Sequence, residues 1–441
     1  MTSRIPDRPG ALPAGDRDRV IAVRKTELLD ALIDHGAIAQ PAQRAAFRQV
    51  CRVLAAICHY AYFAELERLR EDYFYFNPEV EPHARLDTDA LESAYADLVR
   101  SLTQVLASAS FVEMSYDEIA DAHRQHPAVR VTLAAPLDDY REVRFFRRGH
   151  HKEPSTIADL FGLRKRASEI LVHDDVVLLA AMKSAAQIAS QRERKLLERR
   201  KLRPGAVLIK SFRNIPSHDL NALFPNARVV LSLNDKLMLS GPALVAGIPI
   251  LLKLASTITV LFLAIGIYFG IAASVGGEEA AGATAALSAL VALGGFIARQ
   301  WLRYQRQSLK HQTQLAEHIY YRNVANNAGV FDSMIAAAED QQCKEAFLAF
   351  YFLSIAASAP AKAELERAIE SWLRQTFGVD VAFKVDDALE RLHRLGLLQR
   401  NGERLSVLPL DAALDKLDRI WADFFRPQAA TSGTRANGII R

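Results

Sequence analysis

The chain has 441 residues, of which 50% are apolar and 24% are charged. This length allows two or three domains with cores of their own, and the composition excludes both wholesale disorder and a polytopic transporter. Lysine and arginine number 55 against 51 aspartates and glutamates, so the net charge indicates no class of partner by itself.

Both ends of the chain are predicted to be disordered tails, over residues 1–25 and 427–441. The first begins MTSRIPDRPGALPAGDRDR, which is rich in proline, glycine and alternating charge. It has no apolar run, so we do not expect a secretory signal peptide there.

Residues 26–128 are predicted to form a helical region. Apolar residues recur at helical spacing over 26–69, which indicates two amphipathic helices broken near Gly36 and Pro41. A third helix is predicted over 87–108, because the cap-like sequence DTDALE opens it.

The three cysteines are Cys51, Cys58 and Cys343. None has the CxxC spacing of a zinc or redox site, so we expect small buried thiols in a reducing compartment. Cys51 and Cys58 lie two turns apart on one predicted helix, which makes a disulfide between them geometrically unfavourable.

Residues 129–240 are predicted to be an α+β domain on the cytoplasmic side. Short segments rich in valine, isoleucine, leucine and phenylalanine indicate a small sheet with intervening helices. These segments are VRVTL, REVRFF, DVVLLA, AVLIKSF and ARVVLSL.

A basic segment, QRERKLLERRKLRPG, lies within this domain. It is consistent with a solvated helix face, and also with attraction to anionic lipid headgroups, at roughly 1 kcal/mol per basic residue near a membrane surface. We do not expect nucleic-acid binding, because no aromatic residue is interleaved to stack on bases.

Residues 241–300 are predicted to be a membrane hairpin with spans of about 254–275 and 280–298. Each span is uncharged and, as a helix, has a length near the roughly 30 Å of a hydrocarbon core. Lys253 lies at the edge of the first span, where its ammonium group can reach the headgroups. The alternative is a buried helical hairpin of a soluble protein.

The distribution of basic residues predicts the orientation of this hairpin, because short loops rich in lysine and arginine stay cytoplasmic. The loop between the spans has none, and basic residues lie on both outer sides: Lys253, Arg299, Arg303, Arg306 and Lys310. We therefore expect a membrane protein, in the bacterial plasma membrane, with both termini cytoplasmic and the lipid bilayer as a partner. Pairs of small residues in the spans favour either homo-oligomers or packing within the hairpin.

The C-terminal part is predicted as a helical region over 301–360 and a winged-helix-like module over 361–426. In VDDALERLHRLGLLQRNGERLSVLPL, a helix ends at Gly396 and is followed by two strands joined at Asn401-Gly402. Acidic residues offset the basic ones on the helix, so we favour binding of a protein over binding of DNA. The acidic residues are Asp386, Asp387 and Glu390, and the basic ones are Arg391 and Arg394.

Three blocks of sequence resemble an uncharacterised membrane-protein family, a domain-of-unknown-function family that includes transmembrane protein 143 of animal mitochondria. They are REVRFFRRG, LIKSFRNIPSHDLNALFPNARVVLSLNDKLMLSGPALVAGIPILLKL and YYRNVANNAGVFDSMIAAAEDQQCKEAFLAFYFL. The resemblance covers roughly residues 110–425 and implies two spans and no established activity. The family's recurring positions would fall on Arg213, Pro216, Asp219, Pro225, Asn226, Asn326, Asn327, Gly329, Glu339, Lys344 and Glu345.

No catalytic, cofactor-binding or metal-binding residue is predicted. Glu339, Lys344 and Glu345 lie near Cys343 on one predicted helix, and charged residues at this spacing usually form a solvated or ion-paired face. His311 and His318 share a helix face, but no third metal ligand accompanies them.

The predicted fold class is mainly α with a small β-sheet, that is α+β, with a two-span transmembrane hairpin and a C-terminal winged-helix-like module. Three functions fit it. The first is a membrane-anchored scaffold or adaptor that binds an unknown protein partner or anionic lipid. The others are an enzyme at the membrane face that uses Asp219, Glu339 and Lys344, and a channel built from oligomerised hairpins.

Overall fold

The computed structural model describes most of the chain. The described residues are 18–81, 86–115, 117–118, 131–134, 140–159, 164–188, 194–195, 198, 202–224, 228–231, 294–295, 298–299, 302 and 320–424.

The N-terminal part is helical, as the apolar spacing predicts. Helix α1 covers Lys25–Asp34 and α2 covers Pro41–Tyr73, and Gly36, at φ 85°, lies in the break between them. Helix α3 covers Thr88–Ser108, and the Asp87 carboxylate caps it by accepting a hydrogen bond from the Ala90 backbone N–H. All three predicted helices are confirmed.

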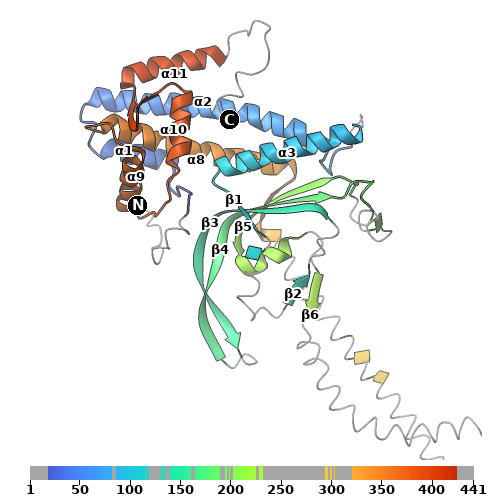
Figure 1. Cartoon of the computed structure of the whole chain (residues 1–441). Coiled ribbons are helices and arrows are strands. Elements are labelled where there is room, and N and C mark those ends of the chain that lie inside the picture. Colours follow the sequence, from blue (N-terminus) through green and yellow to red (C-terminus); the bar gives the residue numbers. More distant parts are fainter. Residues whose placement is uncertain are drawn as a thin grey trace, which may run out of the picture.

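A five-stranded antiparallel sheet lies beneath α2 and α3, in the strand order β1-β3-β4-β5-β7 (Figure 1). Its strands are β1 (Val112–Met114), β3 (Tyr140–Asp159), β4 (Arg164–Met182), β5 (Val207–Pro216) and β7 (Asn323–Asn326). Strands β2 (Val131–Ala134) and β6 (Arg228–Leu231) form a separate antiparallel pair.

Both faces of the central strand β4 are buried over residues 176–182. Val177, Leu179 and Ala181 face a core that they share with α2, α3 and the first half of α8 (Ala328–Ile355). The alternate residues, such as Val176 and Leu178, face a second core, which includes the 3₁₀ helix η2 (Ser217–Leu223). This alternation explains why the sequence of β4 reads as a continuous apolar run.

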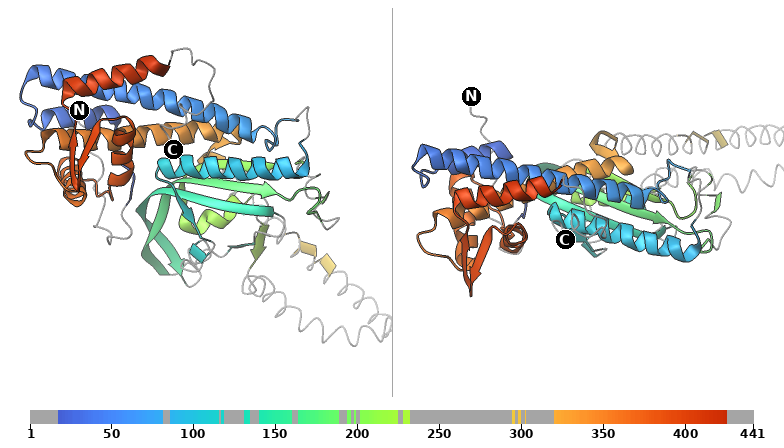
Figure 2. Two further views of the ribbon diagram at one scale, coloured as in Figure 1. Left: turned by 45° about the horizontal axis from the view of Figure 1, so that its top comes forward. Right: turned by 90° about the horizontal axis from the view of Figure 1, so that it is seen from above.

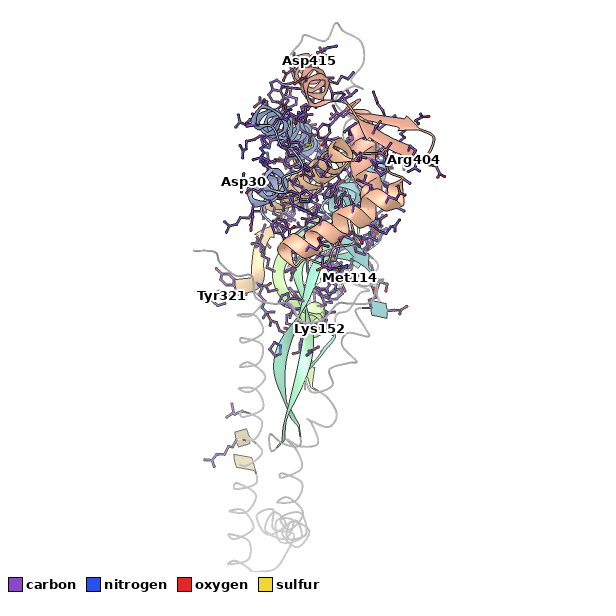
Figure 3. The ribbon with its side chains drawn as sticks, turned by 90° about the vertical axis from the view of Figure 1, so that its left-hand side faces the viewer. Asp30, Met114, Lys152, Tyr321, Arg404 and Asp415 are labelled. Atoms are coloured by element: carbon purple, nitrogen blue, oxygen red, sulfur yellow. The ribbon has the colours of Figure 1, made fainter. Side chains whose placement is uncertain are left out.

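Strands β3 and β4 continue past the sheet as a two-stranded arm. Strand β1 pairs only with residues 145–147 of β3, and β5 pairs with residues 172–181 of β4. Residues 152–159 of β3 and 164–171 of β4 therefore pair only with each other among the described strands. Figure 3 shows the arm extending away from the helices, with Lys152 on it.

The C-terminal elements pack on the second half of α8 and on α2 in a third core. They are α9 (Lys362–Phe377), α10 (Val385–Arg394), β8 (Leu398–Asn401), β9 (Arg404–Val407) and α11 (Leu410–Phe424). The expected order of helix, strand, turn and strand is found here, with Gly396 and Gly402 at positive φ where the chain turns. Figure 2 shows α11 lying along α2.

No helix in the described part of the chain is long and apolar enough to cross a bilayer. This finding contradicts the expected two-span transmembrane hairpin, the classification as an integral membrane protein, and the plasma-membrane localisation with two cytoplasmic termini. The expected spans, 254–275 and 280–298, lie outside the described residues except for Gly294, Gly295 and Ala298. The expectation rests on the length of the two segments and on their lack of charge. An apolar segment can have both properties without spanning a membrane. The fold class is corrected to mixed α+β with a five-stranded antiparallel sheet.

The sheet is also larger than the apolar segments indicate. Strands β3 and β4 extend through polar stretches such as HHKEPST, in which no strand is expected from apolar alternation. The short strands β1 and β7 were not predicted at all.

Candidate functional site

The charged and amide residues singled out in the sequence fall into two groups along α8. Asn327 immediately precedes the helix, whereas Glu339, Lys344 and Glu345 lie at its centre. A rise of 1.5 Å per residue places these groups roughly 18–27 Å apart along the helix axis. They therefore do not form one site.

Asn327 joins the start of α8 to the sheet and to the end of α2. Its Oδ1 accepts hydrogen bonds from Tyr73 Oη at 3.2 Å and from the Ile209 backbone N–H at 3.4 Å, and its Nδ2 donates to Glu79 Oε1 at 2.6 Å. Its backbone has φ 52° and ψ −128°, a conformation that only glycine adopts readily. Within the described part of the chain, its side-chain hydrogen bonds join parts of the protein's own framework, which is a structural role.

The centre of α8 carries the densest group of buried polar side chains in the described fold. We call this group the polar centre of α8. It consists of the buried Gln341, Gln342, Cys343, Lys344 and Glu345, together with the partly exposed Glu339 and Asp340 beside them.

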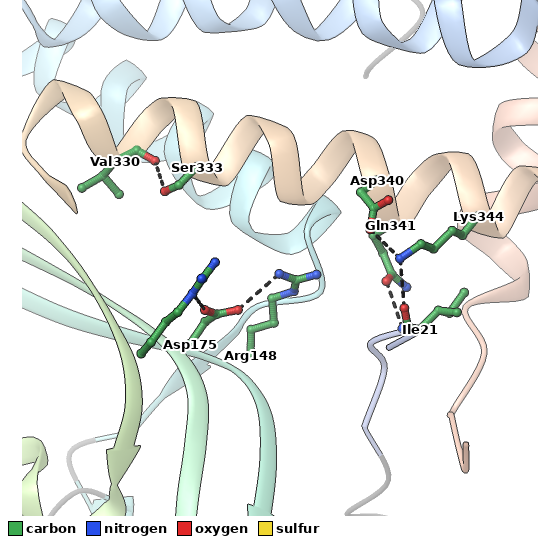
Figure 4. A network of polar contacts seen from close by, with 9 residues as sticks. Ile21, Arg148, Asp175, Val330, Ser333, Asp340, Gln341 and Lys344 are labelled. Atoms are coloured by element: carbon green, nitrogen blue, oxygen red, sulfur yellow. Dashed lines mark hydrogen bonds and ion pairs between the residues drawn. The ribbon is translucent and has the colours of Figure 1, made fainter. Parts of the chain in front are cut away.

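The polar centre of α8 binds the backbone just before α1. Gln341 Oε1 accepts from the Ile21 N–H at 3.1 Å, and Gln341 Nε2 donates to the Arg19 carbonyl at 2.9 Å. Lys344 Nζ donates to the Ile21 carbonyl at 3.1 Å and to the Asp340 carboxylate (Figure 4). Two side chains thus satisfy three backbone groups of a segment that lacks secondary structure of its own.

The same N-terminal segment, residues 18–21, touches two further parts of the fold. The Ala382 N–H, before α10, donates to the Asp18 carbonyl at 2.8 Å. The Asp18 carboxylate accepts from the His150 N–H of β3 at 3.2 Å and lies 3.0 Å from His150 Nδ1. This segment therefore ties together the sheet, α8 and the C-terminal elements.

Glu339 faces the other side of α8. Its carboxylate accepts from His59 Nδ1 on α2 at 2.8 Å and lies 3.8 Å from Lys25 Nζ on α1. It therefore holds the first two helices against α8.

Lys344 is not a free nucleophile or base, because the Ile21 carbonyl and Asp340 engage its ammonium group. Burial lowers the pKa of Lys344 from its ordinary value, and the hydrogen bond to Asp340 acts against that shift.

Glu345 is buried and accepts a hydrogen bond from Gln341 Nε2 at 2.8 Å. Desolvation raises the pKa of Glu345 to about 7, and this effect outweighs the hydrogen bond from Gln341 and the charge of Arg391 on α10.

Arg391 is itself buried beside Cys58 of α2 and Cys343 of α8. The hydrogen bond from the Cys343 thiol lowers the pKa of Cys58 against the effect of burial, and the Arg391 charge lowers it further. The hydrogen bond to Cys58 and burial together raise the pKa of Cys343.

The other residues that the sequence singled out lie elsewhere. Arg213 on β5 donates from Nε to Asp175 of β4 at 3.2 Å, on a carboxylate that also accepts from Arg148 of β3 (Figure 4). Asn326 accepts from Asn323 Nδ2 within β7. Asp219 lies on η2, across the sheet from α8, and so is not brought together with Glu339 and Lys344.

Pro225, Asn226, His311 and His318 lie outside the described residues. Within the described ranges, no group of three or more histidine, cysteine, aspartate or glutamate side chains could hold a metal ion.

This geometry defines an α+β protein in which the polar centre of α8 binds the protein's own backbone and side chains. Residues 173–329 match the family described as "Protein of unknown function (DUF3754)". The resemblance seen in the sequence is therefore confirmed as one to an uncharacterised domain, and nothing in the match links it to a membrane family or to transmembrane protein 143. No solved structure matches the chain.

Sequence reasoning missed the partners of the polar centre of α8. Ile21, His59 and Arg391 lie outside α8 and are distant from it in the sequence. One signal in the sequence could have indicated them. The second half of α8 is apolar around its whole circumference, which is typical of a buried helix. Polar residues within a buried helix need hydrogen-bond partners from other elements.

Proposed function

We propose that the protein is a scaffold that binds a basic protein surface through the acidic face of α10, defined as Asp386, Asp387 and Glu390. The side chains of these residues are 74%, 48% and 56% exposed, although each also forms an ion pair within the fold, with Lys362, Lys384 and Arg394 respectively. The arginines of the same helix point inward, since Arg391 is only 4% exposed and the Arg394 side chain 18%. The proposal rests on this distribution of charge, in which the acidic side chains of α10 face outward and its arginines face inward.

This distribution of charge argues against a DNA-binding role for the helix and hairpin. A helix that reads DNA must present basic side chains to the phosphates and bases. In α10 the two arginines that would do this are committed to the interior. An exposed acidic face instead repels phosphate and complements lysine and arginine on a protein partner.

The acidic face is also held in a fixed position relative to the rest of the fold. Lys384, at the start of α10, donates to the Ala107 carbonyl of α3 at 2.9 Å. Leu389 and Leu392 pack in the same core as the second half of α8. A partner bound to α10 would therefore be oriented relative to the sheet, which is the property of a scaffold.

The polar centre of α8 supports a structural role over a catalytic one. Gln341 and Lys344 bind backbone groups, and Glu339 binds Lys25 and His59. Side chains that perform chemistry must be able to reach a substrate, and these are occupied within the fold.

A site-specific crosslink tests the proposal. A photo-reactive amino acid replaces Glu390 in the full-length chain, expressed in its native host, and the matched control carries it at Arg367, exposed on α9. We expect a discrete crosslinked protein with a basic surface from position 390 only. Equal crosslinking from both positions, or crosslinking to nucleic acid, contradicts the proposal.

The charge argument is tested on the identified partner. Glu390→Lys should weaken its binding by roughly tenfold, and added salt should weaken binding to the wild-type chain. Arg367→Glu is the control and should leave the affinity unchanged. An unchanged affinity for Glu390→Lys would rule out the acidic face as the docking surface.

A further inference from the structure

Two buried histidines lie where the N-terminal segment, residues 18–21, meets the sheet. His150 on β3 and His173 on β4 are 5% and 2% exposed, and they lie directly opposite each other in the register of the two strands. Residues opposite each other in an antiparallel pair share one face of the sheet, with their Cβ atoms roughly 5 Å apart. The two imidazole groups are therefore close neighbours, and both are shielded from water.

Asp18 of the N-terminal segment supplies a carboxylate to this pair of histidines. One carboxylate oxygen lies 3.0 Å from His150 Nδ1, and the other accepts a hydrogen bond from the His150 backbone N–H at 3.2 Å. His173 Nδ1 has no hydrogen-bond partner among the described residues. The arrangement therefore balances the charge of one imidazolium group and not of two.

The groups around His173 oppose a positive charge on it. Its pKa is lowered from 6.5 to about 4, chiefly by burial and also by the charges of Arg147 and His150 on β3, and the Asp18 carboxylate opposes this shift. On β5 the residue paired with His173 is Ile215, which is apolar and offers no counter-charge. His173 is therefore neutral at neutral pH.

The neighbouring charged residues already have partners. Two residues along each strand, on the same face of the sheet, Arg148 pairs with Asp175. On α8, Lys344 pairs with Asp340 beside the N-terminal segment. Among the described residues, these ion pairs leave Asp18 as the carboxylate that faces the two histidines.

The N-terminal segment is the part of this region that can open at the least cost. It belongs to no helix or strand, whereas the other elements around the histidines are paired strands and a buried helix. Local opening occurs most readily in segments that lack regular structure and have few buried contacts. Displacement of Asp18 would let water reach both imidazole groups.

We propose that the N-terminal segment is an acid-released clasp, which joins the sheet, α8 and the C-terminal elements at neutral pH and opens when His150 and His173 are both protonated. Protonation of His173 places a second cation beside His150, and two buried cations with one carboxylate are costly. Opening hydrates both groups. It also breaks the hydrogen bonds of the segment to Gln341, Lys344 and Ala382.

The closed form loses stability as the pH falls. In the open form water reaches His173 and its pKa returns to 6.5, so the open form binds more protons than the closed form, in which this pKa is about 4. The stability of the closed form is therefore complete above pH 6.5 and is lost progressively toward pH 4. With these two pKa values, the ratio of open to closed form rises roughly twentyfold between pH 7 and pH 5.

Hydrogen exchange of the full-length protein between pH 7 and pH 5 tests the proposal. The protection factor of the peptide that contains residues 18–21, corrected for the intrinsic exchange rate at each pH, should fall by roughly twentyfold. Peptides from the middle of α2 and of α8 should keep their protection, because the cores do not open. An equal loss of protection along the whole chain would show acid unfolding and would overturn the proposal.

Variants test the roles of the two partners. His173→Gln cannot take up the proton, so the protection of residues 18–21 should stay nearly constant between pH 7 and pH 5. Asp18→Asn keeps an acceptor for the His150 N–H but lacks the charge, so its N-terminal segment should exchange faster even at pH 7. His393→Gln, at an exposed position of α10, is the matched control and should behave as the wild type.

Circular dichroism establishes that each variant is folded. If His173→Gln does not fold, the wild-type pH profile and the Asp18→Asn variant decide the matter. A folded His173→Gln that keeps the wild-type pH response would overturn the proposal, and so would a wild type whose N-terminal segment keeps its protection at pH 5.

Discussion

Gln341 Nε2 donates one hydrogen bond to Glu345 Oε1 at 2.8 Å, one turn along α8, and another to the Arg19 carbonyl at 2.9 Å. A single amide group thus connects a buried carboxyl group to the N-terminal segment. We therefore expect substitutions at Gln341 and Glu345 to change the stability of the fold, and the stability to depend on pH through Glu345.

Replacing Glu345 with glutamine should stabilise the protein at neutral pH. The pKa of Glu345 is raised to about 7 in the folded protein by desolvation, above its ordinary value of 4.5. Between these values the unfolded chain is ionised and the folded one is protonated, so the wild type loses stability as pH rises through this window. Above pH 7 the accumulated cost is on the order of 3 kcal/mol.

Urea denaturation of the wild type and Glu345→Gln at several pH values from 4 to 8 measures this effect. The gain from the substitution should grow between about pH 4.5 and 7 and then stay constant. A gain that does not depend on pH would contradict the assignment.

Gln341→Leu should release the N-terminal segment from α8. The substitution leaves the Ile21 N–H and the Arg19 carbonyl without their partners, at a cost on the order of 2 kcal/mol. Hydrogen exchange followed by mass spectrometry should show faster exchange in the peptide that contains Ile21. Gln375→Leu, exposed on α9, should leave that peptide unchanged.

Asn327 permits the effects of backbone strain and side-chain contacts to be separated. Asn327→Gly loses the bonds to Tyr73, Ile209 and Glu79 but tolerates φ 52°. Asn327→Ala loses the same bonds and is strained as well, so it should be less stable by a further ~1 kcal/mol. Equal unfolding free energies for the two variants would show that strain does not contribute.

Gly149 and Gly205 allow backbone strain to be separated from a steric clash. Both have positive φ, at 67° and 76°, but a Cβ at Gly149 would collide with the Asp174 carboxyl group, whereas nothing lies within 4 Å of one at Gly205. Gly205→Ala should therefore cost about 1 kcal/mol, and Gly149→Ala clearly more. Thermal unfolding of the two variants measures the difference, and a smaller loss at Gly149 would be inconsistent with this geometry.

Much of the helical framework follows from local sequence. The break at Gly36 and Pro41, the Asp87 cap and the turn after α10 each depend on residues within one or two turns of each other. Such breaks, caps and turns can be predicted from the sequence without knowledge of tertiary contacts.

The sheet and the polar centre of α8 were less predictable, because they depend on contacts distant in the sequence. Gln341 and Ile21, for example, are 320 residues apart. The polar arm of β3 and β4 is stabilised by pairing and carries little apolar alternation, so periodicity did not reveal it. The segments 254–275 and 280–298 show the opposite case, because their length and lack of charge predict a membrane span and no helix in the described part of the chain can cross a bilayer.

The strand order has a practical consequence for studying the family-matched segment alone. The match begins at residue 173, within β4, and ends at residue 329, at the start of α8. A fragment with these limits would lack β3, the neighbour of β4 in the sheet, and nearly all of the helix that covers it. An expression fragment must therefore extend on both sides of the match, to include β3 and the whole of α8, before it can bury the sheet's own hydrophobic face.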